Sequence, residues 1–239
     1  MSRTLLRRLS YGAVAAAAIA VAGVTAPLLA AEDAVVIPAP ALDNEASTAT
    51  QTAVIAGGCF WGVQGVFQHT AGVLNAVSGY AGGDKGTANY NAVSGGNTGH
   101  AEAVEIKYDP KQISYGKILQ IFFSVAHDPT QLNRQGPDSG TQYRSEIFAT
   151  TPEQRKIAEA YIAQLNAAKV YPKPIVTKLS PLKAFYAAEA YHQDYLTLHP
   201  NQPYIAINDL PKIENLKKMF AQNYIAKPTL VSGAKVTAN

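Results

Sequence analysis

Cysteine is nearly absent from this sequence: a single one, Cys59, occurs among 239 residues. One cysteine excludes an internal disulfide framework and every zinc site built on two or more cysteines. The five histidines show no metal-ligand spacing either, so we expect no metal site. The disulfide-rich and zinc-finger classes of protein are therefore excluded.

Charged residues are also few, at 15% of the chain, against 47% hydrophobic residues. The formal net charge of +3 comes entirely from Arg3, Arg7 and Arg8, because no acidic residue occurs before Glu32. The remainder of the chain is neutral, so it lacks the basic surface that nucleic-acid binding requires. The hydrophobic fraction is sufficient for a core, and the length suits one domain of ordinary size.

The first 31 residues have the layout of a secretory signal peptide. A short basic segment, 1–8, precedes an uncharged segment, 11–31, that is rich in Ala, Val and Leu and ends in small residues. The alternative is an uncleaved membrane anchor, since about 20 apolar residues can span a bilayer. We expect cleavage, because the segment is rich in Ala and Gly and Pro27 interrupts it. The mature protein is then expected to be periplasmic or secreted, without stable membrane insertion.

The remaining chain divides into three parts. Residues 32–50 contain Ala, Pro, Thr and acidic residues without periodicity, which is typical of a flexible linker. One folded domain is expected at 51–212, and a C-terminal helix and tail at 213–239.

Hydrophobic periodicity predicts an alternation of strands and helices within the domain. Strands are predicted at 52–56, 73–80, 101–108, 143–149 and 175–179, and helices at 60–69, 114–126, 151–168 and 181–198. The order strand, helix, strand, strand, helix, strand is the split βαβ pattern. We therefore expect an α+β fold, a two-layer ferredoxin-like sandwich with long loops, of which 84–99 is rich in Gly and Asn.

Cys59 follows a predicted strand and a pair of glycines, and begins a predicted helix. Free backbone N–H groups and the positive end of a helix dipole favour the thiolate at such a position. Gly58 and Gly62 would let the backbone approach a ligand, and Phe60 and Trp61 place two aromatic faces beside the sulfur. The alternative is a small buried hydrophobic residue, as most lone cysteines are. The position alone leaves both interpretations open.

Glu102 lies on the hydrophobic face of its predicted strand. Alternation along 101–108 places it with Val104 and Ile106, whereas Glu105 falls on the charged face. A carboxyl group in such a place needs a hydrogen-bonding partner or a raised pKa. It is either a core acid satisfied by backbone donors or a carboxylic acid kept protonated to act as a general acid.

A polar loop that begins at His127 leads into the strand predicted at 143–149. Loops of this kind are often only solvated turns. Asp138 and Tyr143 flank the start of that strand, however, so both side chains could point into a site beside Cys59.

Five blocks of the sequence together resemble the peptide methionine sulfoxide reductase A family, in the family's order. They are 58–62 (GCFWG), 99–104 (GHAEAV), 127–130 (HDPT), 140–145 (GTQYRS) and 188–196 (AEAYHQDYL). The resemblance extends from about Val54 to Leu210, nearly all of the expected mature domain. It implies an enzyme that reduces the S epimer of methionine sulfoxide, free or in proteins, as part of protein repair after oxidation.

The resemblance also implies roles for individual residues. Cys59 matches the nucleophile, which attacks the sulfoxide sulfur and becomes a sulfenic acid. Glu102 matches the acid that protonates the leaving oxygen, and Asp138 matches an acid that supports the site. Tyr90 and Tyr143 match phenols that hydrogen-bond this oxygen.

Phe60 and Trp61 match the apolar wall that receives the methyl group of the substrate. Physical chemistry agrees with these roles, since phenol donors stabilise a developing negative charge. An aromatic wall likewise suits a methyl group on a partly positive sulfur.

The tail departs from the pattern of many family members. Those members carry one or two resolving cysteines near the C-terminus, and residues 226–239 contain none. The resemblance therefore implies a single-cysteine enzyme without a prosthetic cofactor. An external thiol reductant would reduce its sulfenic acid: a thioredoxin- or glutaredoxin-like protein, or glutathione. A monomer without nucleic-acid partners is expected.

Two other functions remain open on the sequence. A cysteine hydrolase or acyltransferase would pair Cys59 with His100, His127 or His192 and form an acyl-enzyme. A secreted binding module with an inert cysteine would show slow alkylation of Cys59. The acid on the hydrophobic face of 101–108 favours the reductase over the hydrolase, because it suits a proton donor.

Overall fold

Six strands form one sheet in the order β7-β6-β1-β3-β2-β8. The computed structural model describes residues 33–44 and 48–231. The strands are β1 (Gln51–Gly57), β2 (Val73–Ala81), β3 (Ala101–Tyr108), β6 (Ser145–Ala149), β7 (Lys178–Pro181) and β8 (Phe185–Ala187). All neighbours are antiparallel except β6 and β7, which are parallel. A separate two-stranded hairpin consists of β4 (Arg134–Gln135) and β5 (Asp138–Ser139).

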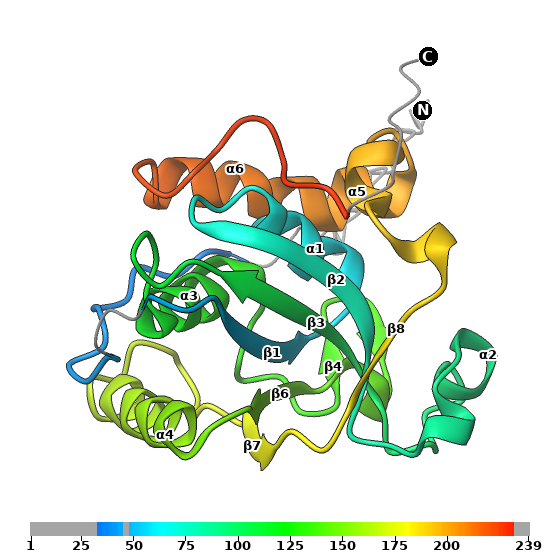
Figure 1. The fold of residues 1–239 in the computed structure, drawn as a ribbon, viewed down its shortest axis with the longest axis horizontal. Helices are drawn as coiled ribbons and strands as arrows, with labels where there is room; N and C mark the ends of the chain where they lie inside the picture. The colour runs from blue at the N-terminus through cyan, green and yellow to red at the C-terminus, as the bar shows by residue number, and fades with distance from the viewer. Residues whose placement is uncertain (1–32, 45–47, 232–239) are drawn as a thin grey trace, which may run out of the picture.

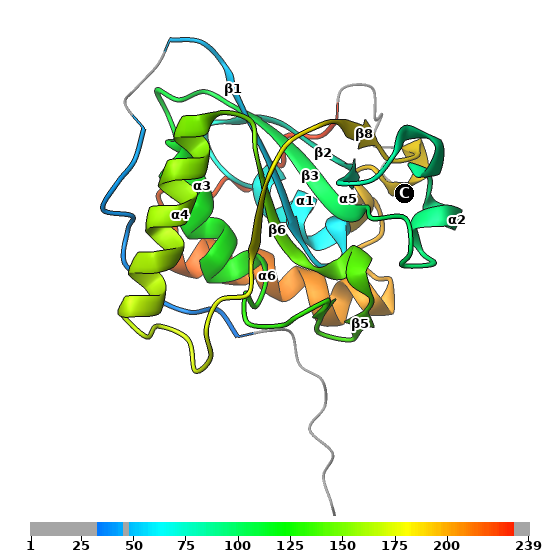
Figure 2. The same cartoon turned by 90° about the horizontal axis from the view of Figure 1, so that it is seen from below.

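The longer helices pack together beside this sheet, so the fold is α+β (Figures 1 and 2). They are α1 (Phe60–Gln68), α3 (Tyr115–Ile121), α4 (Pro152–Ala167) and α6 (Leu210–Met219). Two π-helical turns extend them: η2 (Phe122–Ala126) continues α3, and η5 (Ile205–Asp209) leads into α6. Two further helices, α2 (Tyr90–Val93) and α5 (Tyr195–Leu198), are single turns.

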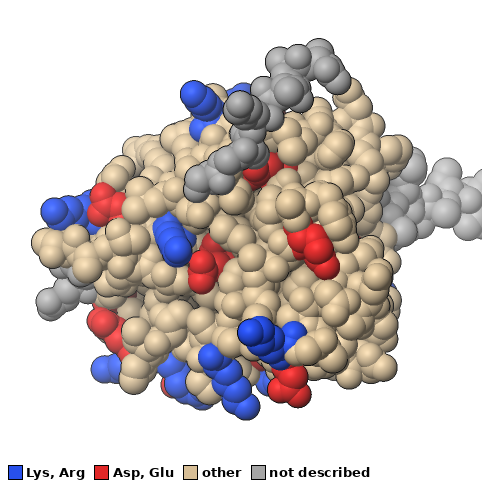
Figure 3. All heavy atoms as spheres, turned by 45° about the vertical axis from the view of Figure 1, so that its right-hand side comes forward, with Lys and Arg blue, Asp and Glu red and all other residues tan. Residues whose placement is uncertain are grey.

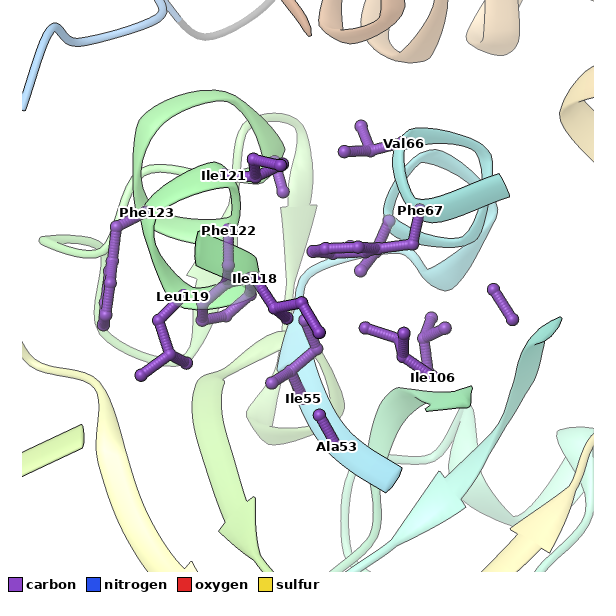
Figure 4. Close-up of a cluster of buried hydrophobic side chains, with 14 of the residues drawn as sticks. Ala53, Ile55, Val66, Phe67, Ile106, Ile118, Leu119, Ile121, Phe122 and Phe123 are labelled. Atoms are coloured by element: carbon purple, nitrogen blue, oxygen red, sulfur yellow. The ribbon is translucent and has the colours of Figure 1, made fainter. Parts of the chain in front are cut away.

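The main core lies between one face of the sheet and these helices. Ile55 of β1 and Ile106 of β3 are buried there against Phe67 of α1 and Ile118 and Phe122 of the α3 segment (Figure 4). The alternation predicted for 101–108 is confirmed, because Ala101 and Ala103 belong to a second cluster on the other face. Glu102 therefore points to the helix-covered face, towards α1.

The other face of the sheet is covered by the chain that joins β7 to β8. This segment runs from one edge of the sheet to the other (yellow in Figures 1 and 2). Leu182 of this segment and Phe185 of β8 pack against the second cluster, which includes Val54, Ala56 and Phe148. The second cluster is small. Most of its buried residues are alanines, whereas the main core contains many large side chains.

The helix starts predicted at 114 and 151 are confirmed, and a capping residue stands at each of them. The Ser114 hydroxyl accepts a hydrogen bond from the Lys117 N–H at 3.1 Å, and Thr151 accepts one from the Gln154 N–H at 3.1 Å. Pro152 stands in the first turn of α4, where its missing N–H costs no helical hydrogen bond.

The predicted last strand and helix, 175–179 and 181–198, are wrong. β7 begins at Lys178, and 182–198 contains β8, a 3₁₀ turn at Ala190–His192 and the single turn α5. Gln193 explains much of the difference, since its side-chain amide donates to the carbonyls of Ser78 and Ala188 and accepts the Ser78 N–H. Long-range polar contacts with β2 thus hold this segment in an irregular path.

The flexible linker predicted for 32–50 is also wrong over residues 33–44. The Val35 N–H donates to the Ser124 carbonyl at 3.0 Å, and Tyr161 donates its hydroxyl to the Pro38 carbonyl at 2.7 Å. Ile37 is buried in the main core. The segment is therefore an extended strap across α3 and α4, whose contacts carry no periodic signal.

The two other predicted boundaries are the end of the domain at 212 and the end of the signal peptide at 31. The limit at 212 falls inside α6, which packs on α1, so the domain continues beyond it. The predicted signal peptide, 1–31, lies outside the described residues. Within the described ranges, no helix has the length and apolar character needed to cross a membrane.

Candidate active site

Cys59 is the N-cap residue of α1, at the turn that leaves β1. Gly58 makes this turn with a φ of +91°, a conformation that favours glycine. The turn places the sulfur at the end of the two central strands, where β1 ends and β3 begins. The residue as a whole is partly exposed, and protein atoms closely surround its thiol.

Glu102 lies beside this turn from the neighbouring strand β3. Its carboxylate oxygen Oε2 accepts a hydrogen bond from the Phe60 N–H at 3.0 Å, the first residue after Cys59. The side chain is 4% exposed. Burial is the main cause that raises its pKa to about 8; the negative charges of Asp138 and Asp209 add to it, and the Phe60 N–H opposes it. Glu102 is thus mostly protonated at neutral pH.

The hairpin β4-β5 and the turn after it bring Asp138 and Tyr143 to the same place. Asp138 accepts a hydrogen bond from the Tyr204 hydroxyl, and burial raises its pKa despite this bond and the nearby Lys212. Burial also raises the pKa of the Tyr143 phenol, with further contributions from Glu102, Asp138 and Cys59. The phenols of Tyr143 and Tyr204 are therefore both protonated donors at neutral pH.

Two aromatic residues follow Cys59 on α1 and lie in an aromatic cluster. The Phe60 ring is buried between Tyr80 and His192, with ring centroids 5.9 and 5.0 Å away. Trp61 stacks on Tyr195 at 3.9 Å and donates its indole N–H to His192 Nδ1 at 3.2 Å. The partly exposed Trp61 and the buried Phe60 form an apolar wall next to the sulfur.

Tyr90 reaches this cluster from α2, which lies within the long loop 84–99. Its ring is 4.7 Å from the His192 ring and is 37% exposed. Glu189 fixes the loop, because its carboxylate accepts the Tyr90 N–H and the Tyr80 hydroxyl, each at 2.9 Å. All seven residues predicted for the site are thus brought together; their roles stay predictions.

The expected thiolate is not what the surroundings favour. Burial, followed by the negative charges of Glu102, Asp209 and Asp138, raises the pKa of the Cys59 thiol well above its ordinary value. The Trp61 N–H, at the start of α1, opposes this shift but does not outweigh it. The helix start predicts a thiolate only if no carboxylates face it, and here three do.

The two site glycines make room for protein side chains rather than for a ligand. A Cβ atom at Gly58 would lie 2.6 Å from Gln135 Cβ. One at Gly62 would lie 2.2 Å from Asp209 Oδ1 and 3.2 Å from Lys212 Nζ. Gly62 thereby allows the C-terminal part of the chain to pack directly on the first turn of α1.

The histidines do not form a nucleophile-base pair with Cys59. Both ring nitrogens of His100 bind backbone groups of Gly83 and Asp84, and those of His127 bind the Phe122 carbonyl and the Ser145 hydroxyl. His192 Nδ1 accepts the Trp61 indole N–H. Over residues 33–44 and 48–231, no three His, Cys, Asp or Glu side chains are grouped so as to hold a metal ion.

Four residues of the site were not singled out on the sequence: Tyr204, Glu189, Asp209 and Lys212. Glu189 lies in the last of the five blocks, which offered a signal. Asp209 and Lys212 are buried charges, 0% and 6% exposed, in a helical segment. Nothing in their local spacing distinguishes them from solvent-exposed residues, so only the structure reveals them.

Several known proteins are similar to this chain in sequence. The family described as peptide methionine sulfoxide reductase matches residues 51–224. A Mesorhizobium japonicum protein named peptide methionine sulfoxide reductase MsrA 2 is 61% identical over 193 residues, covering 81% of this chain and 99% of its own. A Synechocystis protein of the same name is 51% identical over 196 residues, covering 80% and 92%.

Solved structures give the same result. Mxr1 from Saccharomyces cerevisiae in reduced form has a TM-score of 0.60 at 33% identity, covering 68% of this chain and 92% of its own. Methionine sulfoxide reductase A of Corynebacterium diphtheriae has a TM-score of 0.55 at 33% identity, covering 74% and 92%. This chain therefore belongs to the peptide methionine sulfoxide reductase A family.

Proposed function

We infer that this protein reduces the S epimer of methionine sulfoxide, free or within proteins, to methionine. The observation that carries the inference is the buried Glu102 carboxyl, which binds the Phe60 N–H next to Cys59 and has a pKa of about 8. A proton donor is thereby held beside the one sulfur nucleophile of the chain. The names of the relatives at 61% and 51% identity support the same activity.

The first step transfers one oxygen atom to Cys59. The Cys59 sulfur attacks the sulfoxide sulfur while Glu102 donates its proton to the sulfoxide oxygen, which becomes more basic as its bond to sulfur weakens. The thiol proton passes to the Glu102 carboxylate. The hydroxyl group then moves from the methionine sulfur to the Cys59 sulfur as the bond between the two sulfurs breaks. The products are methionine, whose sulfur has gained two electrons, and a Cys59 sulfenic acid, whose sulfur has lost two electrons.

The surrounding residues stabilise this step. Tyr143 and Tyr90 are proposed to donate hydrogen bonds to the oxygen, where negative charge develops. Phe60 and Trp61 receive the methyl group. Asp138, held by Tyr204, supports the polar side of the pocket. Charged side chains of both signs are scattered over the face shown in Figure 3, and most of this face is uncharged, which suits recognition of a neutral sulfoxide.

Recycling uses an external thiol, because Cys59 is the only cysteine of the chain and no intramolecular disulfide is possible. One thiol condenses with the sulfenic acid, releasing water and forming a mixed disulfide, and a second thiol releases Cys59. The reductant we propose is a thioredoxin- or glutaredoxin-like protein, or glutathione.

We also propose a fold class, a location and an oligomeric state for this protein. The strand order β6-β1-β3-β2, antiparallel throughout, supports assignment of the core to the split-βαβ, ferredoxin-like class. The basic and apolar segments of 1–31 support export to the periplasm or the exterior with cleavage of a signal peptide. The protein is proposed to act as a monomer.

Turnover of the two resolved sulfoxide epimers with dithiothreitol tests the activity. The S epimer should be consumed and the R epimer should persist. The Cys59→Ser variant should be inactive, because no other residue can accept the oxygen, and its circular dichroism should be unchanged. Residual turnover above a hundredth of the wild-type rate in this variant, or consumption of the R epimer alone, would overturn the proposal.

A further inference from the structure

A buried ion pair lies against the helix that begins at Cys59. Asp209, the last residue of η5, and Lys212, in the first turn of α6, are 0% and 6% exposed, and Lys212 Nζ lies 3.5 Å from Asp209 Oδ1. Taking two charges out of water is costly. A buried pair at this place therefore calls for an explanation beyond its contribution to stability.

The pair contacts the first turn of α1. A Cβ atom at Gly62, three residues after Cys59, would overlap Asp209 Oδ1 and approach Lys212 Nζ. Both η5 and α6 pack along α1. The part of the chain that comes closest to this turn from the C-terminal side thus contributes a carboxylate and an ammonium group.

The charges that face Cys59 come from several elements. They are Glu102 of β3, Asp138 of β5 and Asp209 of η5, with the phenols Tyr143 and Tyr204 and the ammonium of Lys212 nearby. Asp209 raises the pKa of both the Cys59 thiol and the Glu102 carboxyl, and Lys212 lowers the pKa of Asp138. The two members of the pair thus act on different groups.

We propose that Asp209 and Lys212 are positioning residues that fix where the protons of the site reside before substrate binds. The Asp209 carboxylate packs on the first turn of α1, and its negative charge adds to burial in favouring the protonated forms of Cys59 and Glu102 for the oxygen transfer. The Lys212 ammonium, 3.5 Å from Asp209 Oδ1, balances the charge of Asp209 and opposes the effect of burial on Asp138, so that Glu102 is the carboxyl that donates. This deepens the proposed function and depends on it for its purpose.

Alkylation of Cys59 by iodoacetamide tests the pair independently of sulfoxide reduction. Cys59 is the only thiol of the full chain, and its alkylation rate follows the thiolate fraction. In Asp209→Asn we expect the midpoint of the pH dependence to fall by about one unit or more, which is about tenfold faster alkylation at pH 7.5. Glu214→Gln, which removes an exposed carboxylate from α6, should leave the rate unchanged.

A double variant separates the proposed role of Asp209 from an effect of misfolding. Asp209→Asn combined with Lys212→Met removes both buried charges, should unfold at a higher urea concentration than Lys212→Met alone, and should keep the faster alkylation. The alkaline limit in the pH profile of reduction should also fall in Asp209→Asn, and Lys212→Arg should retain the wild-type profile.

A merely structural pair would lower stability and leave the alkylation midpoint within about 0.3 pH units of the wild-type value, against the shift of about one unit expected. That result, or loss of the fold in both Asp209 variants, would overturn the proposal. Failure of the wild-type enzyme to reduce sulfoxide would instead overturn the proposed function, and the alkylation result would stand apart from it.

Discussion

Replacing Glu102 by Gln separates the role of its proton from the role of its shape. The amide retains the size of the side chain and an oxygen that can accept the Phe60 N–H, but it cannot donate a proton to the sulfoxide oxygen. General acids typically contribute about 10²–10⁴-fold to a rate. We expect the reductive step at pH 7 to slow by this factor, with little change in substrate binding.

The same substitution predicts a change in how stability depends on pH. The carboxyl has a pKa of about 8 in the folded protein and near 4.5 when unfolded, so the folded state holds one more proton between these values. Stability contributed by this group is complete below about pH 4.5 and is lost as the pH rises, at about 1.4 kcal/mol per unit, or about 4 kcal/mol by pH 8. Glu102→Gln removes this dependence.

Urea unfolding, followed by the fluorescence of Trp61, the only tryptophan, measures both proteins at several pH values from 5 to 8. The wild-type free energy of unfolding should fall relative to that of Glu102→Gln as the pH rises, because other titrating groups are common to both. Glu105→Gln, on the same strand but the opposite face, controls for lost charge and should retain near wild-type activity. Parallel stability curves together with an unchanged single-turnover rate would refute the reasoning.

Two substitutions test the packing around the site. In Gly62→Ala the new Cβ overlaps Asp209 Oδ1, so overpacking should lower the free energy of unfolding by about 1–3 kcal/mol, whereas Gly86→Ala, with no atom within 4 Å, should change it little; equal urea midpoints would contradict the contact. Tyr204→Phe removes the donor to Asp138 and should cost about 1–3 kcal/mol, because it leaves a partly buried acceptor without this hydrogen bond; an unchanged urea midpoint would contradict this.

The central strands and helices could be predicted from the sequence because their signals are local. Alternation along 101–108 identified the face that Glu102 occupies, and hydrophobic periodicity identified the helices α3 and α4. The strap at 33–44 and the path of 182–198 could not be predicted. Their positions depend on hydrogen bonds to residues far along the chain, such as those of Gln193 to Ser78, and such bonds leave no periodic pattern.

In the candidate site, too, contacts between residues far apart in the sequence could not be predicted. Motif blocks identified Cys59 and Glu102, but the charge balance around the thiol depends on Asp209 and Lys212, more than 100 residues further on. A sequence interval carries no information about which charges meet in space. The tendency of a helix start to favour a thiolate is outweighed for this reason, whereas the pKa of the Glu102 carboxyl is raised, as one of the two alternatives for this residue supposed.

The most direct test of the account is the stoichiometry of reduction without any reductant. Enzyme mixed with excess S-sulfoxide should form one methionine per chain and stop, since Cys59 is the only sulfur that can take the oxygen as a sulfenic acid. Mass spectrometry should then show nearly complete labelling of Cys59 by dimedone, which reacts with sulfenic acids. More than one methionine per chain, or a product that dimedone never labels, would contradict the single-cysteine mechanism.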